Sequence, residues 1–450
     1  MSKDYTDKNP GLGALYASHI ETLCSRHDHA LEQAGASHAV IYSGNPHIAF
    51  LDDYQMPFNP NPHFISWVPL LELPFSYIVY TPGEKPRLIY FQPRDYWHVV
   101  PGEPQGYWTA YFDIRIVHDR KDIADHLPDA REKCIVIGEV TDDEIAFGIE
   151  RINPNTAINI LHYARGIKTA YEIEALRLSS YRGACGHQAA AAAFRDGRSE
   201  FDIHRAYCKA VSLTDNELPY TNIVALNEHG AVLHYTKLQR RAPATLRSFL
   251  IDAGAQVHGY ASDITRTYAF SDTRFEALIA RMDLLQQQIV DKVQAGVDYR
   301  ELHIENHRLL AGLLVEAELA SGDADTLLET GVTSAFFPHG LGHLLGLQVH
   351  DVGGFMENES GTTIDPPSGH PFLRLTRVLE ADMVLTIEPG LYVIDMLLEN
   401  LRGTPAEHHV NWSTVDWLRP FGGIRIEDNV RVMAGGQQNL TREAFANAPD

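Results

Sequence analysis

The chain has 450 residues, of which 44% are hydrophobic and 21% are charged, as is usual for a globular protein. This length exceeds what one hydrophobic core normally supports, so we expect two domains. The 59 acidic and 37 basic residues give a formal net charge of −22, which disfavours nucleic acid and anionic membranes as partners.

The cysteines and the amino-terminal residues indicate the cellular compartment of the protein. Four cysteines lie far apart in the sequence, at Cys24, Cys134, Cys185 and Cys208. This spacing argues against a disulfide framework and a zinc ribbon, and it is typical of free thiols in a reducing compartment. The amino-terminal residues lack the apolar segment of a signal peptide, and no uninterrupted apolar run is long enough to span a bilayer. We therefore expect a soluble cytoplasmic protein.

Helix and strand signals alternate in the first third of the chain. A helical stretch from about Leu15 ends near Gly35, and β-branched and aromatic runs predict five strands at 39–43, 77–80, 87–91, 114–117 and 134–137. The Pro- and Asn-rich segment after the first of these strands predicts a surface loop, which carries Asp53. From Thr169 onward, apolar residues recur every three or four positions, which predicts a long amphipathic helix. We place the domain boundary near Arg165, between an α/β domain (1–165) and a second domain (166–450) that holds the chemical motifs.

The first of these motifs is a predicted β-hairpin over residues 248–270. A turn centred between Val257 and His258 would place Asp252 directly opposite Asp263, with their Cβ atoms about 5 Å apart. A bulge at Gly254 would shift this register by one residue. The two aspartates could also flank a surface turn. Because Asp is depleted in strands and like charges repel at this distance, we favour a site that holds a cation between them.

A glycine-rich segment then brings three histidines within twelve residues: His339, His343 and His350. The spacing of His339 and His343 matches the helical pair of zinc proteases. However, Pro338 and the glycines predict irregular backbone, and the glutamate of the HExxH motif is missing. We therefore expect one histidine to bind a metal ion, and the others to support it or contact substrate.

Two further carboxylates lie on predicted strands. Glu388 ends an apolar strand and precedes Pro389, and Glu427 shares one strand face with Arg425. Each could alternatively be a solvated strand end or part of a surface ion pair. Taken together, four carboxylates and one imidazole form an oxygen-rich set that suits Mn²⁺ and balances the charge of two divalent ions.

The motifs resemble the pita-bread dinuclear metallopeptidases, which include methionine aminopeptidase, aminopeptidase P and prolidase. The likeness to the bacterial prolidase branch (Xaa-Pro dipeptidase and organophosphorus acid anhydrolase) runs along nearly the whole chain. It includes the segments FLDDYQMPF, PYTNIVALNE, SDITRTY, FFPHGLGH and PFGGIRIEDN. The resemblance implies an α+β fold: an α/β N-terminal domain and a pita-bread C-terminal domain with a curved mixed β-sheet flanked by helices.

The resemblance also implies roles for single residues. Two divalent ions, with Mn²⁺ preferred, would be bound by Asp252, Asp263, His343, Glu388 and Glu427, of which Asp263 and Glu427 would bridge the ions. The substrate pocket would contain Tyr220, His234, Tyr299, His339, His350 and Arg425. Asp53 would reach the pocket of a partner subunit in a homodimer or a dimer of dimers. Leu344 and Leu345 stand where the anhydrolase has histidine and isoleucine, so we expect a different pocket shape.

The expected reaction is hydrolysis of an Xaa-Pro dipeptide by a water that two metal ions activate. Glu388 would accept the water's proton and return it to the proline nitrogen, and His350 or His234 would help to stabilise the oxyanion. Arg425 would bind the dipeptide carboxylate or orient Glu427. The same chemistry could cleave organophosphate triesters as a side activity. Three alternatives stay open: an aminopeptidase P, a primary organophosphate hydrolase and a non-catalytic binding protein.

Overall fold

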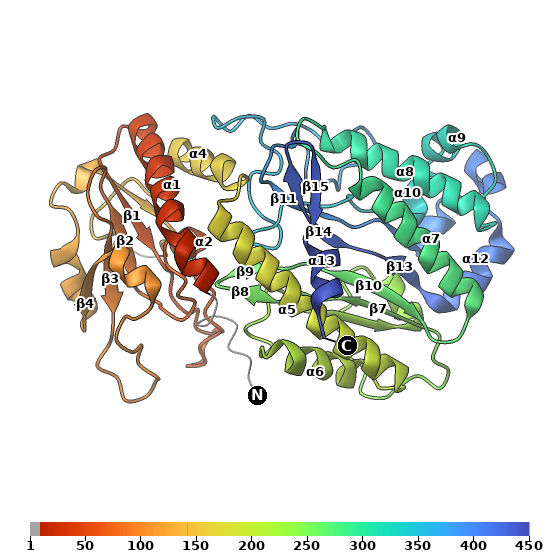
Figure 1. The fold of residues 1–450 in the computed structure, drawn as a ribbon, viewed down its shortest axis with the longest axis horizontal. Helices are drawn as coiled ribbons and strands as arrows, with labels where there is room; N and C mark the ends of the chain where they lie inside the picture. Colours follow the sequence, from red (N-terminus) through yellow and green to blue (C-terminus); the bar gives the residue numbers. More distant parts are fainter. Residues whose placement is uncertain (1–9, 142, 450) are drawn as a thin grey trace.

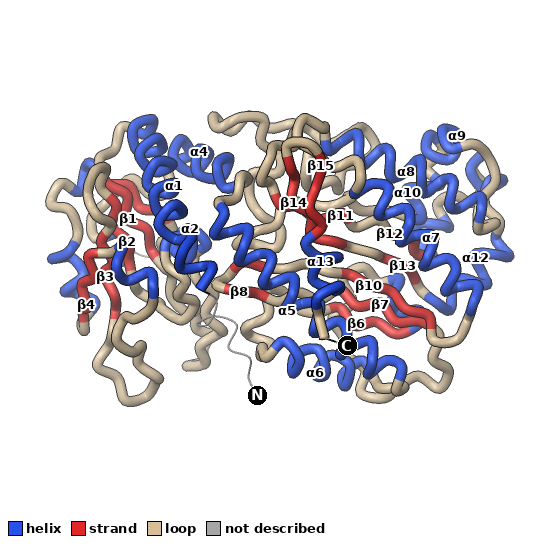
Figure 2. The backbone as a smooth tube through the Cα atoms, viewed as in Figure 1, coloured by secondary structure: helices blue, strands red, loops and turns tan. Residues whose placement is uncertain are grey.

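Two lobes lie side by side along the longest axis of the molecule (Figure 1). The computed structural model describes residues 10–141 and 143–449. The first lobe is built on a five-stranded sheet, and the second on several short sheets with helices around them (Figure 2). Among the described helices, none combines the length and the apolar character needed to span a bilayer.

The sheet of the first lobe is mixed and has the strand order β4-β3-β2-β1-β5. The pairs β1–β2 and β2–β3 are antiparallel, whereas β1–β5 and β3–β4 are parallel. The sequence predicted all five strands within one residue of their observed ends: β1 (His38–Tyr42), β2 (Tyr77–Tyr80), β3 (Arg87–Phe91), β4 (Asp113–Val117) and β5 (Cys134–Ile137).

Helices cover this sheet and connect it to the second lobe. In the first lobe they are α1 (Pro10–Ala34), α2 (Pro62–Trp67), α3 (Asp143–Ala146) and α4 (Asn155–Arg165). α1 packs against α4 and against the long helix α5 (Ala170–Arg195) of the second lobe. The predicted end of α1 is confirmed, because Gly35 follows it with a left-handed φ of 59°. The predicted start of α5 is confirmed as well, because Thr169 and Glu172 form a capping box there.

In the second lobe, every strand pair among the described residues is antiparallel. Two three-stranded sheets have the orders β10-β7-β6 and β11-β14-β15, and two further pairs are β8-β9 and β12-β13. The strands are β6 (Ile223–Leu226), β7 (Ser248–Asp252), β8 (Gln256–Val257), β9 (Tyr260–Ala261), β10 (Thr265–Ala269), β11 (Val384–Ile387), β12 (Gly390–Tyr392), β13 (Gly423–Arg425), β14 (Asp428–Met433) and β15 (Gly436–Asn439).

The helices of this lobe pack around the short sheets, with α7 and α8 against each other at one end (Figure 2). Besides α5 they are α6 (Glu200–Val211), α7 (Thr273–Val290), α8 (Tyr299–Glu316), α9 (Ala324–Glu329), α10 (Val332–Phe336), α11 (Asp395–Glu399), α12 (Trp412–Leu418) and α13 (Leu440–Asn447). The 3-10 helices of the chain are η1 (Tyr107–Tyr111), η2 (Arg120–His126), η3 (Arg131–Lys133), η4 (Asn227–Ala231), η5 (Pro405–His409) and η6 (Arg419–Phe421).

The β7–β10 hairpin has a different register from the predicted one. Asp252 lies opposite Thr265, not opposite Asp263. The turn is centred between His258 and Gly259, whose φ values of 53° and 83° fit a type I′ turn. The predicted direct pairing was therefore wrong. Because strand side chains alternate with a period of two, Asp263 still shares a face with Thr265 and Asp252, as a diagonal neighbour.

A buried ion cluster joins the two lobes. Lys168 Nζ lies 2.8 Å from Asp351 Oδ2, and Arg165 Nε lies 3.1 Å from Asp351 Oδ1. All three side chains are almost completely inaccessible to solvent. Burial raises the pKa of Asp351, but the charges of Arg165 and Lys168 outweigh that effect and hold it far below its ordinary value. The cluster ties the end of α4 to the loop that follows His350.

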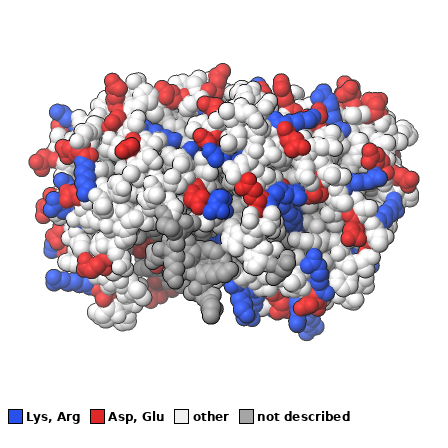
Figure 3. Space-filling view, in the orientation of Figure 1, with Lys and Arg blue, Asp and Glu red and all other residues white. Residues whose placement is uncertain are grey.

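Acidic and basic side chains are interspersed on the face that Figure 3 shows. The net charge of −22 is therefore not gathered there into one acidic patch. Among the described residues, all four cysteines are free thiols, as their spacing predicted.

Candidate active site

The five predicted metal ligands come from segments that are far apart in the sequence. Asp252 ends β7, and Asp263 lies between β9 and β10. His343 lies in irregular backbone after α10, as the surrounding glycines predicted, and Glu388 directly follows β11. Glu427 lies in the short gap between β13 and β14 and bridges to Thr265 of β10. The fold therefore brings the ends of β7, β10, β11 and β13 and the loop after α10 together in the second lobe.

Their donor atoms converge. An oxygen of Asp263, an oxygen of Glu427 and a ring nitrogen of His343 all lie within 4.8 Å of one another. His343 Nε2 is 3.4 Å from Asp263 Oδ2 and 3.7 Å from Glu388 Oε1. The hydroxyl of Tyr220 lies 2.8 Å from Asp252 Oδ1 and 2.5 Å from Asp263 Oδ1, and so connects the two aspartates.

The charge of this cluster fits bound cations. Burial, followed by repulsion from neighbouring carboxylates, raises the pKa of Glu427 well above its ordinary value. Burial also raises the pKa of Asp252, and it raises the pKa of Glu388 to about 7 although His343 and Arg425 oppose the shift. Carboxylates packed this closely can all ionise only when positive charge compensates them. Four carboxylates and one imidazole are a suitable donor set for two divalent ions.

The backbone around His343 fixes the orientation of its ring. Its Nδ1 lies 3.0 Å from the carbonyl oxygen of Leu344, so Nδ1–H donates there and the ring is turned with Nε2 toward the carboxylates. Its backbone N–H donates to the hydroxyl of Thr386. The carbonyl oxygen of Thr386 in turn accepts from the hydroxyl of Tyr299. Tyr299 is 0% exposed, and this bond supports the strand that leads to Glu388.

Arg425 is buried, and each of its three guanidinium nitrogens donates to a partner within the site. Nη2 donates to Asp252 Oδ2 at 2.7 Å, Nη1 to the hydroxyl of Tyr392 at 3.0 Å, and Nε to Thr265 Oγ1 at 3.1 Å. The Thr265 hydroxyl donates onward to Glu427 Oε2 at 2.7 Å. Arg425 is therefore linked to two of the carboxylates, directly and through Thr265. The alternative of a surface ion pair on an edge strand is wrong, because Arg425 is 4% and Glu427 2% exposed.

His339 lies on the other side of this network. Its Nε2 is 2.8 Å from the Tyr392 hydroxyl, and its Nδ1 is 2.8 Å from the carbonyl oxygen of Gly340. Nδ1 is also 3.7 Å from Glu388 Oε2. Burial and the charge of Arg425 lower the pKa of His339 to about 3, so the ring is neutral.

The cluster opens into a cleft of about 2180 Å³ that both lobes line. Second-lobe residues in its wall include Tyr220, His234, Asp252, Asp263 and His350. The ring of His350 packs edge-on against His343, with centroids 4.3 Å apart. Burial, then the charges of His343 and Arg374, lower the pKa of His350 to about 4, which leaves the ring neutral.

The structure also places the pair Leu344–Leu345 and Asp53, which the resemblance connected with the pocket. Leu344 and Leu345 are 0% exposed and belong to the hydrophobic cores, so they do not shape the cleft wall directly. Asp53 lies in an exposed loop between β1 and α2. His47 and Phe58 of that loop line the cleft, whereas Asp53 is not among the described residues that do.

The sequence reasoning missed several supporting residues. Thr265 could have been found, since it lies two positions after Asp263 and thus on the same strand face. Tyr392 lies in the glycine-containing motif after Glu388, but its bond to Arg425 depends on the β12–β13 pair. Arg374 is exposed and acts on His350 electrostatically. No local pattern marks it.

Comparisons with known proteins agree with this architecture. Residues 14–163 match the family model "Xaa-Pro dipeptidase, N-terminal domain", and residues 174–434 match "Metallopeptidase family M24". The chain is 52% identical over 438 residues to an Xaa-Pro dipeptidase of Stenotrophomonas maltophilia, covering 97% of this chain and 98% of the relative. It is 50% identical over 440 residues to an Xaa-Pro dipeptidase of Xanthomonas oryzae pv. oryzae, covering 98% and 99%.

Solved structures share the fold at lower sequence identity. A variant of Escherichia coli aminopeptidase P in complex with substrate aligns with a TM-score of 0.71 and 22% identity, covering 95% of this chain and 97% of the other. Proline aminopeptidase P II from Yersinia pestis aligns with a TM-score of 0.70 and 23% identity, covering 96% of each chain. The expected α+β pita-bread fold is confirmed. The chain belongs to metallopeptidase family M24, in the branch that carries the N-terminal domain of the Xaa-Pro dipeptidases.

Proposed function

We propose that the protein is an Xaa-Pro dipeptidase that works with two divalent metal ions, Mn²⁺ by preference. The convergence of four carboxylates and one imidazole at the wall of a large cleft carries the proposal. The proposed ligands are Asp252, Asp263, His343, Glu388 and Glu427. The full-length identity to proteins named Xaa-Pro dipeptidase supports the substrate class.

The chain's own residues would manage the proton and the developing negative charge. Bound metal ions supply Lewis-acid activation of water. Glu388 lies at the edge of the cluster, 3.7 Å from His343 Nε2, and its carboxylate can accept a proton from water and return it to the leaving proline nitrogen. His350 is neutral and faces the cleft, where its N–H can donate to the carbonyl oxygen of the scissile bond. His234 is exposed in the same wall and is proposed for the same contact.

We assign Arg425 to positioning and a different arginine to substrate. Each of the three guanidinium nitrogens of Arg425 donates a hydrogen bond inside the site, which commits this side chain to the carboxylate cluster. Arg374 is exposed, and its charge acts on His350. A guanidinium at that place can bind the carboxylate of a dipeptide. Tyr220 and His339 would hold ligands and pocket shape through their hydrogen bonds.

The remaining expectations stay part of the proposal. A boundary near Arg165 is supported by the end of α4 there and by the two family-model matches on either side. A homodimer through the loop of Asp53 is supported by Phe50 and Leu51, which are 91% exposed. The four free cysteines fit a cytoplasmic location. Cleavage of organophosphate triesters is proposed as a side activity, since the cleft is larger than a dipeptide requires.

The test compares Leu-Pro with the tripeptide Leu-Pro-Gly, using enzyme stripped of metal and re-supplied with Mn²⁺, Co²⁺ or Zn²⁺. We expect no turnover without metal, the highest activity with Mn²⁺, and strong preference for the dipeptide. Preference for the tripeptide would identify an aminopeptidase P instead. Metal binding without any turnover would favour a non-catalytic protein. A triester assayed in the same preparation separates a side activity from a primary one.

A further inference from the structure

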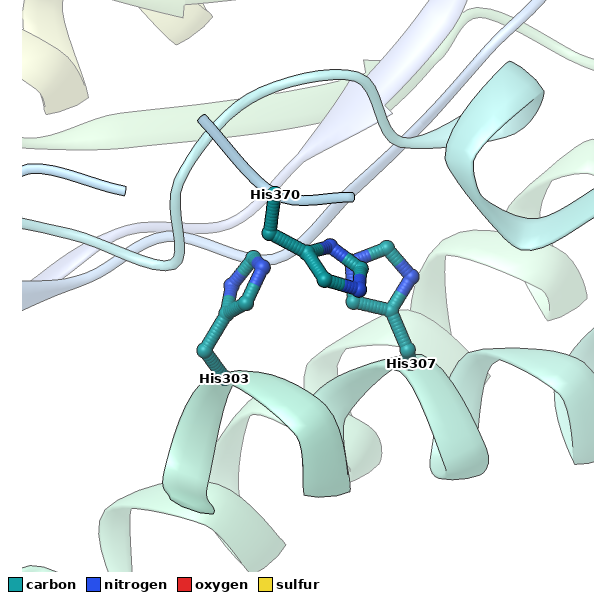
Figure 4. Close-up of side chains that lie close together, drawn as sticks. All are labelled: His303, His307 and His370. Carbon is teal, nitrogen blue, oxygen red and sulfur yellow. The ribbon is translucent and has the colours of Figure 1, made fainter. Parts of the chain in front are cut away.

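Three histidines lie together outside the carboxylate cluster. His303 and His307 are four residues apart on α8, and His370 reaches toward them from the loop that follows residue 366 (Figure 4). One ring nitrogen from each lies within 4.8 Å of the other two. The ring centroids of His303 and His307 are 4.7 Å and 4.5 Å from that of His370. Residues four apart on a helix share one face, so α8 presents two imidazoles to the third.

Three buried ring nitrogens of this cluster lack hydrogen-bond partners. His303 and His307 are each 1% exposed. Neither ring nitrogen of His303 has a partner, and neither does Nε2 of His307. Leaving a buried polar atom without a partner is unfavourable, and folded proteins leave few of them. Three such atoms in one cluster indicate that a common partner belongs between the rings.

The chemistry of the set indicates which partner. Burial lowers the pKa of His303 to about 2 and that of His307 to about 3, so both rings are neutral, which is the form that binds metal ions. Nδ1 of His307 is 3.0 Å from Thr333 Oγ1, and a bond there would fix the ring with Nε2 toward the cluster. Imidazole-only sets suit Zn²⁺, Cu²⁺ and Ni²⁺, whereas Mn²⁺ favours oxygen ligands.

We propose that His303, His307 and His370 bind one divalent transition-metal ion of the zinc type. Three imidazoles would hold the ion. Because His370 is only half-buried, water would reach a fourth coordination position on its side of the site. The ring of Phe337 packs against both His303 and His339, so it separates this site from the carboxylate centre. The ion would cross-link α8 to the loop of His370.

A second group of potential ligands carries less weight. His204, Cys208 and Asp215 also lie close enough to share an ion. However, His204 Nε2 already contacts Asp215 Oδ1 at 2.6 Å, and the side chain of Asp215 is 80% exposed. Burial raises the pKa of the Cys208 thiol to about 11, which disfavours the thiolate that binds metal. This group is satisfied without an ion.

The test counts zinc in the full-length enzyme. Mn²⁺-loaded wild type, His370→Ala and His408→Ala proteins are incubated with Zn²⁺, passed through gel filtration and analysed for both metals. His370 is half-buried in a loop, so its replacement should leave the fold intact, which circular dichroism checks. His408 is an exposed histidine and serves as the matched control. We expect wild type and His408→Ala to hold one more zinc ion per chain than His370→Ala.

Crystals soaked in Zn²⁺ provide the second measurement. An anomalous peak between the three rings is expected in wild type and not in His370→Ala. The proposal is overturned if the three proteins carry equal zinc. It is also overturned if the extra ion depends on His408, or if the density between the rings lacks anomalous signal and is therefore water.

Discussion

Arg425 and Asp252 form a buried ion pair at the edge of the ligand cluster, with Nη2 2.7 Å from Oδ2. The same guanidinium reaches Glu427 through the hydroxyl of Thr265. The Arg425 guanidinium on β13 therefore holds the carboxylate of Asp252 at the end of β7 and that of Glu427 between β13 and β14. This arrangement explains why an arginine two residues before a proposed ligand need not touch substrate.

Replacing Arg425 with Lys should lower kcat and metal affinity while leaving the KM for Leu-Pro nearly unchanged. Lysine lacks the planar fork and cannot keep three contacts at once, so metal affinity should fall about 10- to 100-fold. Steady-state kinetics at several metal concentrations measure both effects. Arg374→Ala is the comparison, with KM expected to rise about 10- to 100-fold. A rise in KM alone for Arg425→Lys would instead place that residue on the substrate.

Thr265→Val keeps the side-chain shape but removes the hydroxyl between Arg425 and Glu427. We expect metal affinity to fall about 10- to 100-fold, because Glu427 loses a donor and Arg425 loses an acceptor. Isothermal titration with Mn²⁺ measures this change. Thr267→Val is a useful control on the same strand face, since the Thr267 hydroxyl donates to the backbone carbonyl of Arg425 and contacts no ligand carboxylate. Equal losses in both variants would mean a general effect on the strand.

Asp351→Asn should lower the free energy of unfolding by about 3–5 kcal/mol, because it leaves Arg165 and Lys168 buried without a negative partner. Urea denaturation measures the loss. Asp382→Asn is the control: its pair with Arg431 is part-exposed and should matter by at most about 1 kcal/mol. Similar losses in the two variants would contradict the structural role of the buried cluster.

The contribution of Asp351 should also depend on pH. Its pKa in the folded chain lies far below the ordinary 3.8, so the unfolded chain takes up a proton first as the pH falls. The stabilisation is therefore complete well above 3.8 and decreases below about pH 4.5. Unfolding curves of wild type and Asp351→Asn across this range should converge as acid is added. A stability difference that stayed constant would argue against a depressed pKa.

Metal removal should destabilise the protein more at high pH than at low pH. Without cations, burial holds the pKa of Glu388 at about 7 against an ordinary 4.5, so the folded chain binds more protons than the unfolded chain between these values. Stability of the stripped protein then falls as pH rises, by up to about 1.4 kcal/mol per pH unit for each such group. Calorimetry at about pH 5.5 and about pH 8, with and without chelator, measures the difference. Glu388→Gln should make the chelator effect less dependent on pH. Equal chelator effects at both pH values would contradict a raised pKa of Glu388 in the stripped protein.

The sequence by itself predicted the strands of the first lobe, the ends of two long helices and the residue types of the candidate site. The five strands of the first lobe, the end of α1 at Gly35 and the start of α5 at Thr169 follow from short-range patterns of β-branched residues, caps and periodicity. The proposed metal ligands could also be named from short-range patterns. Carboxylates and a histidine among apolar strand residues and glycines stand out locally, whatever the distant contacts are.

Tertiary structure alone decided the register and the partners. The hairpin turns between His258 and Gly259 rather than one residue earlier, and only the packed strands show Asp252 opposite Thr265. The Tyr299 hydroxyl donates to the carbonyl oxygen of Thr386, and His370 meets His303 across a long stretch of intervening chain. Such contacts join residues that are far apart in sequence, so they depend on how whole elements pack, and no local pattern encodes them.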